Sequence, residues 1–185
     1  MATGDLTTLA NVKQWINVAN ATDDALLTRL ITSVSNFMQS WLNRQLNSAS
    51  YADVYDGAGS DIQMLSNYPV SAVSGVVIDG ITIPASTGPT SPGWTFDQYS
   101  VKLIGGYRFS SGNANVAISY TSGYATMPVE IEQACIELVS LRYSERLRPG
   151  VTSRSLGGEN ISYSSSGISD SVSELLQQYK KVVPI

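Results

Sequence analysis

The stretch Thr22–Arg44, TDDALLTRLITSVSNFMQSWLNR, decides what kind of fold this chain can adopt. Thr22 is suited to the N-cap of a helix, and Asp23 and Asp24 complement the helix dipole in the first turn. The apolar residues that follow recur at intervals of three and four over about five turns, the pattern of an amphipathic helix. They are Leu26, Leu27, Leu30, Ile31, Val34, Phe37, Met38, Trp41 and Leu42. We therefore predict a long helix whose wide apolar stripe packs against other helices.

Three weaker helical patterns lie on either side of this segment. A short one follows Thr7 or Thr8 as a cap, with apolar positions at Leu9, Val12 and Ile16. A longer one begins near Thr126, places Pro128 in its first turn and ends before Pro149. Its apolar positions are Ile131, Ala134, Cys135, Leu138 and Leu141, and those of a final short helix are Val172, Leu175, Leu176 and Tyr179.

The segment between the second and third helices has a different texture. From Tyr51 to Tyr124, Val, Ile, Tyr and Thr are broken by Gly, Pro, Asn and Asp, which is typical of short antiparallel strands. Asp79 and Gly80 form a favoured type I′ hairpin turn. We expect an α+β protein of one domain, in which residues 1–48 supply N-terminal helices, 49–122 form an antiparallel β insertion of six or seven strands, and 123–185 supply C-terminal helices.

Composition excludes several classes of function. Of the 185 residues only 14% are charged, and the net charge of −4 argues against a dedicated nucleic-acid binder. The absence of histidine removes Ser-His-Asp and Cys-His nucleophilic sites and HExxH zinc sites. No apolar run approaches the roughly 20 residues that span a bilayer, and residues 1–8 do not resemble a signal peptide. The single cysteine, Cys135, lies on an apolar helix face and is predicted to be a core residue.

No motif in the chain indicates catalysis. Asp53, Asp56 and Asp61 are close in sequence and could in principle act as acid and base or bind calcium. They surround a predicted turn, where Asp is common for its local hydrogen bonds, and they lack the spacing and the final Glu of an EF-hand. We expect no catalytic, cofactor or metal site.

One cluster of positive charge stands out near the end of the third helix. Arg142, Arg146, Arg148 and Arg154 are four of the eleven cations and are opposed only by Glu145. Arg142 and Arg146 share one helix face because they are four residues apart. The cluster either complements the helix dipole or forms a docking surface for a neighbouring subunit or partner.

Several of these segments resemble tailed-phage head-to-tail connector proteins, also called adaptor or head-completion proteins. The similarity covers about residues 5–47 and 120–185, and it includes no catalytic signature. The matching stretches are Leu6–Trp15, Thr22–Ile31, Trp41–Arg44, Gly123–Tyr124, Pro128, Ile131–Leu138, Arg142–Arg146 and Gly158–Tyr163.

The resemblance implies an antiparallel bundle of about four helices that assembles as a ring, usually of twelve subunits. The ring sits beneath the portal protein in the neck of the virion, extends the DNA channel and receives the next connector, stopper or tail protein. DNA passes through the lumen without sequence-specific binding, and no membrane or cofactor takes part. The subunit is made in the host cytoplasm. The C-terminal segment grips the portal, a role that falls here on Val172, Leu175, Leu176, Tyr179, Lys180 and Lys181.

Two other functions stay open from the sequence. The Tyr and Trp content of residues 94–124 would suit a carbohydrate-binding or adhesin-type β module. A small hydrolase that uses the carboxylates of Asp53, Asp56 or Asp61 is the weaker alternative.

Overall fold

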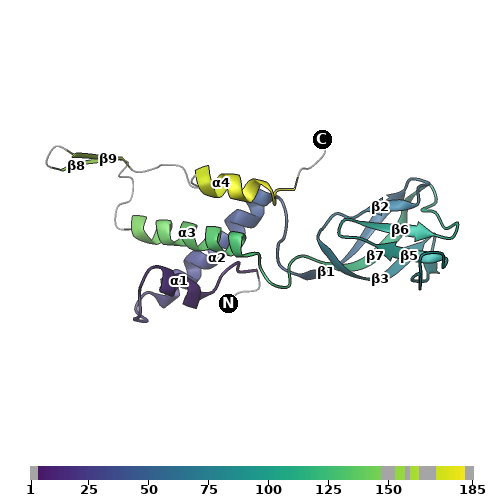
Figure 1. Cartoon of the computed structure of the whole chain (residues 1–185), viewed down its shortest axis with the longest axis horizontal. Helices are drawn as coiled ribbons and strands as arrows, with labels where there is room; N and C mark the ends of the chain where they lie inside the picture. The colour runs from purple at the N-terminus through teal and green to yellow at the C-terminus, as the bar shows by residue number, and fades with distance from the viewer. Residues whose placement is uncertain (1–3, 147–152, 157–158, 163–169, 182–185) are drawn as a thin grey trace. The chain divides into compact units, whose positions relative to one another are not determined.

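The computed structural model describes residues 4–146, 153–156, 159–162 and 170–181, and the chain divides into two compact units (Figure 1). Unit 1 comprises Met1–Arg44 and Met127–Ile185, and unit 2 comprises Gln45–Thr126. Among the described residues, all the helices belong to unit 1. Unit 2 is built from strands.

Unit 1 contains two long and two short helices among its described residues. They are α1 (Leu9–Trp15), α2 (Asp24–Leu42), α3 (Val129–Glu145) and α4 (Asp170–Gln177). Thr8 caps α1 as expected, because its hydroxyl accepts a hydrogen bond from the Asn11 amide. Thr22 does not cap α2: the N-cap is Asp23, whose side chain makes no capping bond. Asn43 ends α2 in the left-handed conformation, which Asn tolerates better than most residues.

The core of unit 1 forms around α3, which is buried on more than one side. Leu27, Ile31, Val34, Met38 and Leu42 of α2 are buried, whereas Leu26 at the edge of the predicted stripe is exposed. On α3, Leu141 is more exposed than predicted, and two positions that the sequence pattern did not single out are buried. The buried apolar residues of α3 are Ile131, Ala134, Cys135, Ile136, Leu138 and Val139. A helix that is apolar on several faces is surrounded by other elements, so α3 is the centre of this unit.

Unit 2 consists of two antiparallel sheets that share one apolar core. The strands are β1 (Ala49–Gly57), β2 (Ile62–Met64), β3 (Val70–Ile78), β4 (Ile81–Ile83), β5 (Gly93–Phe96), β6 (Ser100–Ile104) and β7 (Gly112–Ser122). One sheet has the order β1-β7-β3-β4 and the other β2-β6-β5. Asp79 and Gly80 form the expected turn between β3 and β4, both with positive φ. The core contains Val76, Ile78, Val116, Ile118 and Tyr120 of the first sheet and Val101 and Leu103 of the second.

The structure overturns the predicted helical bundle. Helices α1 and α4 have 7 and 8 residues, so each makes only about two turns and cannot run alongside α2, which has 19 residues, as a bundle member must. Strands form as large a part of the described chain as helices do, and they include the hairpin of β8 (Ser153–Leu156) and β9 (Glu159–Ser162). The fold is mixed, dominated by antiparallel sheets with few helices, and it contains no four-helix bundle.

Candidate functional site

The two described arginines at the end of α3 are engaged within unit 1. The Arg142 guanidinium carbon lies 5.3 Å from the centroid of the Phe37 ring on α2. That of Arg146 lies 3.5 Å from the ring centroid of Tyr143, and its Nη2 is 3.6 Å from Oδ2 of Asp23. Both side chains therefore join α3 to α2. Arg148 lies outside the described residues, and Arg154 lies on β8.

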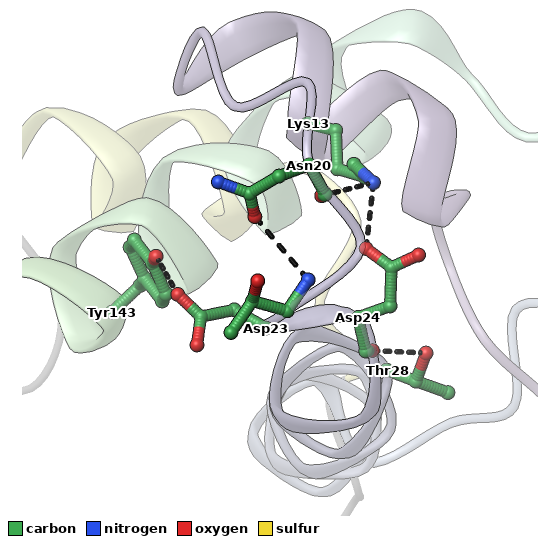
Figure 2. A network of polar contacts seen from close by, with 7 residues as sticks. Lys13, Asn20, Asp23, Asp24, Thr28 and Tyr143 are labelled. Carbon is green, nitrogen blue, oxygen red and sulfur yellow. Dashed lines mark hydrogen bonds and ion pairs between the residues drawn. The ribbon is translucent and has the colours of Figure 1, made fainter.

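A polar network fixes the N-terminal end of α2 to its neighbours (Figure 2). The Tyr143 hydroxyl of α3 donates to Oδ2 of Asp23. Lys13 Nζ of α1 lies 2.7 Å from the Asn20 carbonyl oxygen and 2.6 Å from Oδ1 of Asp24. The hydrogen bond to the Asp23 carboxylate raises the pKa of Tyr143, so its hydroxyl keeps the proton that it donates. The first turn of α2 is thus held from both sides by ionic and charge-assisted contacts.

The expected portal-binding residues of α4 divide into an inner and an outer set. Val172 and Leu176 are buried, with 4% and 0% of their surface exposed, and so belong to the core of unit 1. Leu175, Tyr179 and Lys181 are half-buried, and Lys180 is exposed. Of these six residues, only the outer set is accessible to a partner while α4 is docked.

The segment that follows α4 is attached to the end of α2. The Lys181 amide donates to the Leu42 carbonyl over 2.9 Å, and Nη1 of Arg44 donates to the Tyr179 carbonyl over 3.3 Å. Lys180 Nζ lies 4.5 Å from the centroid of the Trp41 ring, within the range of a cation–π contact. These contacts place the polar end of the C-terminal segment beside the C-terminus of α2.

Sequence reasoning missed the anchoring of the N-terminal segment. Leu6 is 2% exposed, and its amide donates to the buried Ser35 hydroxyl of α2 over 3.0 Å. Oε1 of Glu132 on α3 accepts from the Thr7 hydroxyl at 3.1 Å and from the side-chain Nδ2 of Asn11 at 2.6 Å. Residues 4–11 are therefore tied to both long helices. No periodicity marks these bonds in the sequence, because each partner is more than twenty residues away.

Of the three aspartates considered for catalysis, two accept hydrogen bonds that support the fold, and the third does not join them. Asp53 Oδ2 accepts from the Tyr120 hydroxyl at 2.6 Å and from the Tyr55 hydroxyl at 2.9 Å. Burial, and then the bond to Asp53, raise the pKa of Tyr120, which therefore stays protonated. Asp56 Oδ1 accepts from the Ala114 amide, and Asp61 precedes β2. The structure does not assemble them into an acid–base pair.

Metal binding and thiol chemistry find no support among the described residues. No group of three or more His, Cys, Asp or Glu side chains there could hold a metal ion. Cys135 is fully buried, with its Sγ 3.7 Å from the Ser35 hydroxyl, and burial raises the pKa of the thiol to about 12. It is a core residue, as predicted. None of the helices that the structure describes is long and apolar enough to cross a membrane.

Comparison with known proteins gives a family and a fold. The model of the head completion protein family matches residues 5–182, which include both units. No curated protein matches the chain.

Three solved structures with a similar fold come from gene transfer agent (GTA) particles. A chain in the neck of an empty GTA particle, computed with C6 symmetry, aligns with a TM-score of 0.62 and 17% identity, over 100% of this chain and 94% of that one. A chain in the virion of a native GTA particle gives 0.61 and 17%, with the same coverage. A chain in the neck of a native particle, computed with C12 symmetry, gives 0.54 and 16%, over 100% and 95%.

Proposed function

We propose that this chain, which belongs to the head completion protein family, works as one subunit of a ring in the neck of a tailed phage or a phage-like particle, where it joins the head to the tail. The match over residues 5–182 carries this proposal, because it includes the sheets of unit 2 as well as the helices of unit 1. The β unit is thus part of the family fold, which weighs against the carbohydrate-binding or adhesin alternative.

The ring is supported by the symmetry of the particles that contain chains of this fold. Those necks were computed with C6 and C12 symmetry. A ring of twelve copies with a net charge of −4 each would be strongly acidic. Such a ring repels duplex DNA within a Debye length of about 8 Å at physiological salt, which suits a channel that DNA must pass through without binding.

For the partners we propose the portal protein on one side and the next connector, stopper or tail protein on the other. The outer set of α4 and the segment after it, Leu175, Tyr179, Lys180 and Lys181, is the proposed portal contact, and Val172 and Leu176 hold this helix in place. Arg146 at the end of α3 is exposed and is the second proposed contact, with Arg142 beside it and Arg148 and Arg154 in the same stretch of chain.

A structural rather than an enzymatic role fits the side chains that could have carried chemistry. Asp53 and Asp56 are used in hydrogen bonds that hold strands and loops together, and Cys135 is buried as a neutral thiol. The activity of the protein is then assembly itself.

The experiment that tests this function is removal of the chain from its own particle. Particles assembled without it should accumulate as heads without tails, and addition of the purified chain to such heads in an extract should restore tailed particles. Lys180→Glu should reduce this restoration, whereas Gln178→Glu, a change at another exposed residue on the turn after α4, should not. Normal yields of tailed particles in the absence of the chain would refute the connector role.

A further inference from the structure

Unit 2 presents two outer faces that differ in character. On the β1-β7-β3-β4 sheet, the register places Ala52, Ser119 and Gly75 in one row and Val54, Ala117 and Val77 in the next. These positions alternate with the core residues Ile118, Tyr120 and Val76 and therefore point away from the core. We call these six residues the flat face. It contains only small or β-branched uncharged side chains, and Val54 is 59% exposed.

The outer face of the other sheet carries large apolar side chains. Ile62 and Met64 on β2 pair with Lys102 and Ser100 of β6, positions that alternate with the buried Val101 and Leu103. Ile62 is 45% exposed and Met64 is 61% exposed. Lys102 beside them is neutralised by Asp97 at 2.8 Å. We call Ile62 and Met64 the apolar knob.

Both surfaces have properties that favour burial against protein. The outward side of a solvated antiparallel sheet is usually polar, and charged side chains are common on protein surfaces. The centres of protein interfaces are depleted in charge. The short side chains of the flat face lose little conformational entropy when a partner covers them. Burial of the exposed Ile and Met side chains is favourable because it removes apolar surface from water.

We propose that the flat face of one copy packs against the apolar knob of the next copy, head to tail, and so forms the contact between β units around the ring. This inference rests on the proposed function. The two sheets enclose one core, so their outer faces point in opposite directions. A contact between unlike faces can repeat from copy to copy, and it closes into a ring when each copy is rotated by a fixed angle relative to the one before. A contact between two flat faces would instead stop at a dimer.

The occupant is a second copy because the charge of the chain favours a contact through uncharged surfaces. Every copy has a net charge of −4, so identical chains approach most easily where neither surface presents an unpaired charge. The flat face spans three strands about 4.8 Å apart over about three residues of each, which is roughly 150 Å². A standard stable interface buries about 800 Å² on each partner. One such contact is therefore weak alone and becomes effective when it repeats around a ring and is joined by contacts of unit 1.

Cross-linking through introduced cysteines tests the contact on the full-length chain. The native Cys135 is buried and stays a neutral thiol below about pH 9, so it gives no background. We would place Ala117→Cys on the flat face and Met64→Cys on the apolar knob, in single and double variants. A short bismaleimide would be added to each over a concentration series up to about millimolar, the range of weak contacts. The matched control pairs Met64→Cys with Thr90→Cys, which lies in an exposed loop.

A head-to-tail contact predicts a ladder of oligomers from the double variant only, at a yield roughly tenfold above the control pair. Dimers from Ala117→Cys alone would show a contact between two flat faces and overturn the proposal. So would a double variant that never exceeds the control up to millimolar concentration. If the ladder forms while particles assemble normally without the chain, the connector role fails and the contact stands. If particles need the chain but no ladder forms, the contact fails and the connector role stands.

Discussion

Replacement of Leu176 by alanine should release α4 from unit 1 while the rest of the unit stays folded. Leu176 is fully buried, and with Val172 it forms the apolar side of a helix of only 8 residues. So short a helix is not stable by itself in water, so its structure depends on docking. Loss of the Leu176 side chain removes about half of the fully buried apolar contact and leaves a cavity.

The size of the effect follows from what holds α4 in place. Burial of Val172 and Leu176 contributes about 2 kcal/mol each. The hydrogen bonds from Lys181 to Leu42 and from Arg44 to Tyr179 contribute about 1 kcal/mol each. A buried Leu→Ala change costs about 2–5 kcal/mol, so the substitution removes one of the largest of these contributions and adds the cost of a cavity.

Hydrogen exchange measured by mass spectrometry distinguishes local release from global unfolding. In the L176A variant, peptides that cover 170–181 should lose their protection, and peptides that cover α2 and α3 should keep theirs. Glu174→Ala is the matched control because Glu174 lies on the exposed side of the same helix. The reasoning is refuted by an α4 that stays protected in L176A, or by a loss of protection that is equal in α2, α3 and α4.

Three further predictions concern single contacts. Glu132→Ala leaves two donors near the N-terminus without their acceptor, so it should lower the free energy of unfolding in urea by about 1–3 kcal/mol and expose residues 4–11 to exchange. Gly123→Ala should be far more destabilising than Gly106→Ala. Both glycines have positive φ, but only at Gly123 would a Cβ lie 2.4 Å from the Asn47 carbonyl oxygen. Equal melting temperatures of the two variants would contradict this. Burial raises the pKa of Cys135 from 9.0 to about 12. The contribution of the neutral thiol to the free energy of unfolding is therefore complete below pH 9 and declines by up to about 1.4 kcal/mol per pH unit above it. In urea titrations from pH 8 to 11, Cys135→Ala should remove this contribution to the slope.

The elements of the fold could be predicted from local pattern, but their arrangement could not. The spacing of Leu27, Ile31, Val34 and Met38 identifies α2 because helical periodicity is a property of neighbouring residues. The alternation from Val116 to Tyr120 identifies β7 for the same reason. A bundle requires helices of similar length, and the sequence itself indicates that the first and last helices are short. The bundle is implied only by the resemblance to connector proteins. The prediction of four bundled helices failed at that point.

The candidate site shows the same limit, because a local pattern is visible in the sequence and its long-range partners are not. The clustering of Arg142 and Arg146 on one helix face is visible in the sequence, but their partners are not. Arg146 pairs with Asp23 and Arg142 stacks on Phe37, residues more than a hundred positions away. In the sequence, where its partners are not visible, such a charge cluster looks free for docking. In the fold, much of its binding capacity is directed inward to join α3 to α2.

In the fold of unit 2, most of the few charged side chains lie away from the outer surfaces of the sheets. Its charged side chains lie in turns, at strand ends, on the core side of β1 or in the Lys102–Asp97 pair; they are Asp53, Asp56, Asp61, Asp79, Asp97, Lys102 and Arg108. Strand β7 shows the consequence, because Val116, Ile118 and Tyr120 face the core while Ala117 and Ser119 between them face outward. An isolated domain has no need to keep charge off its outer sheet surfaces, whereas a subunit that must pack against identical acidic copies does. Under the proposed head-to-tail contact, the scarcity of charge on these outer surfaces serves the packing of one copy against the next.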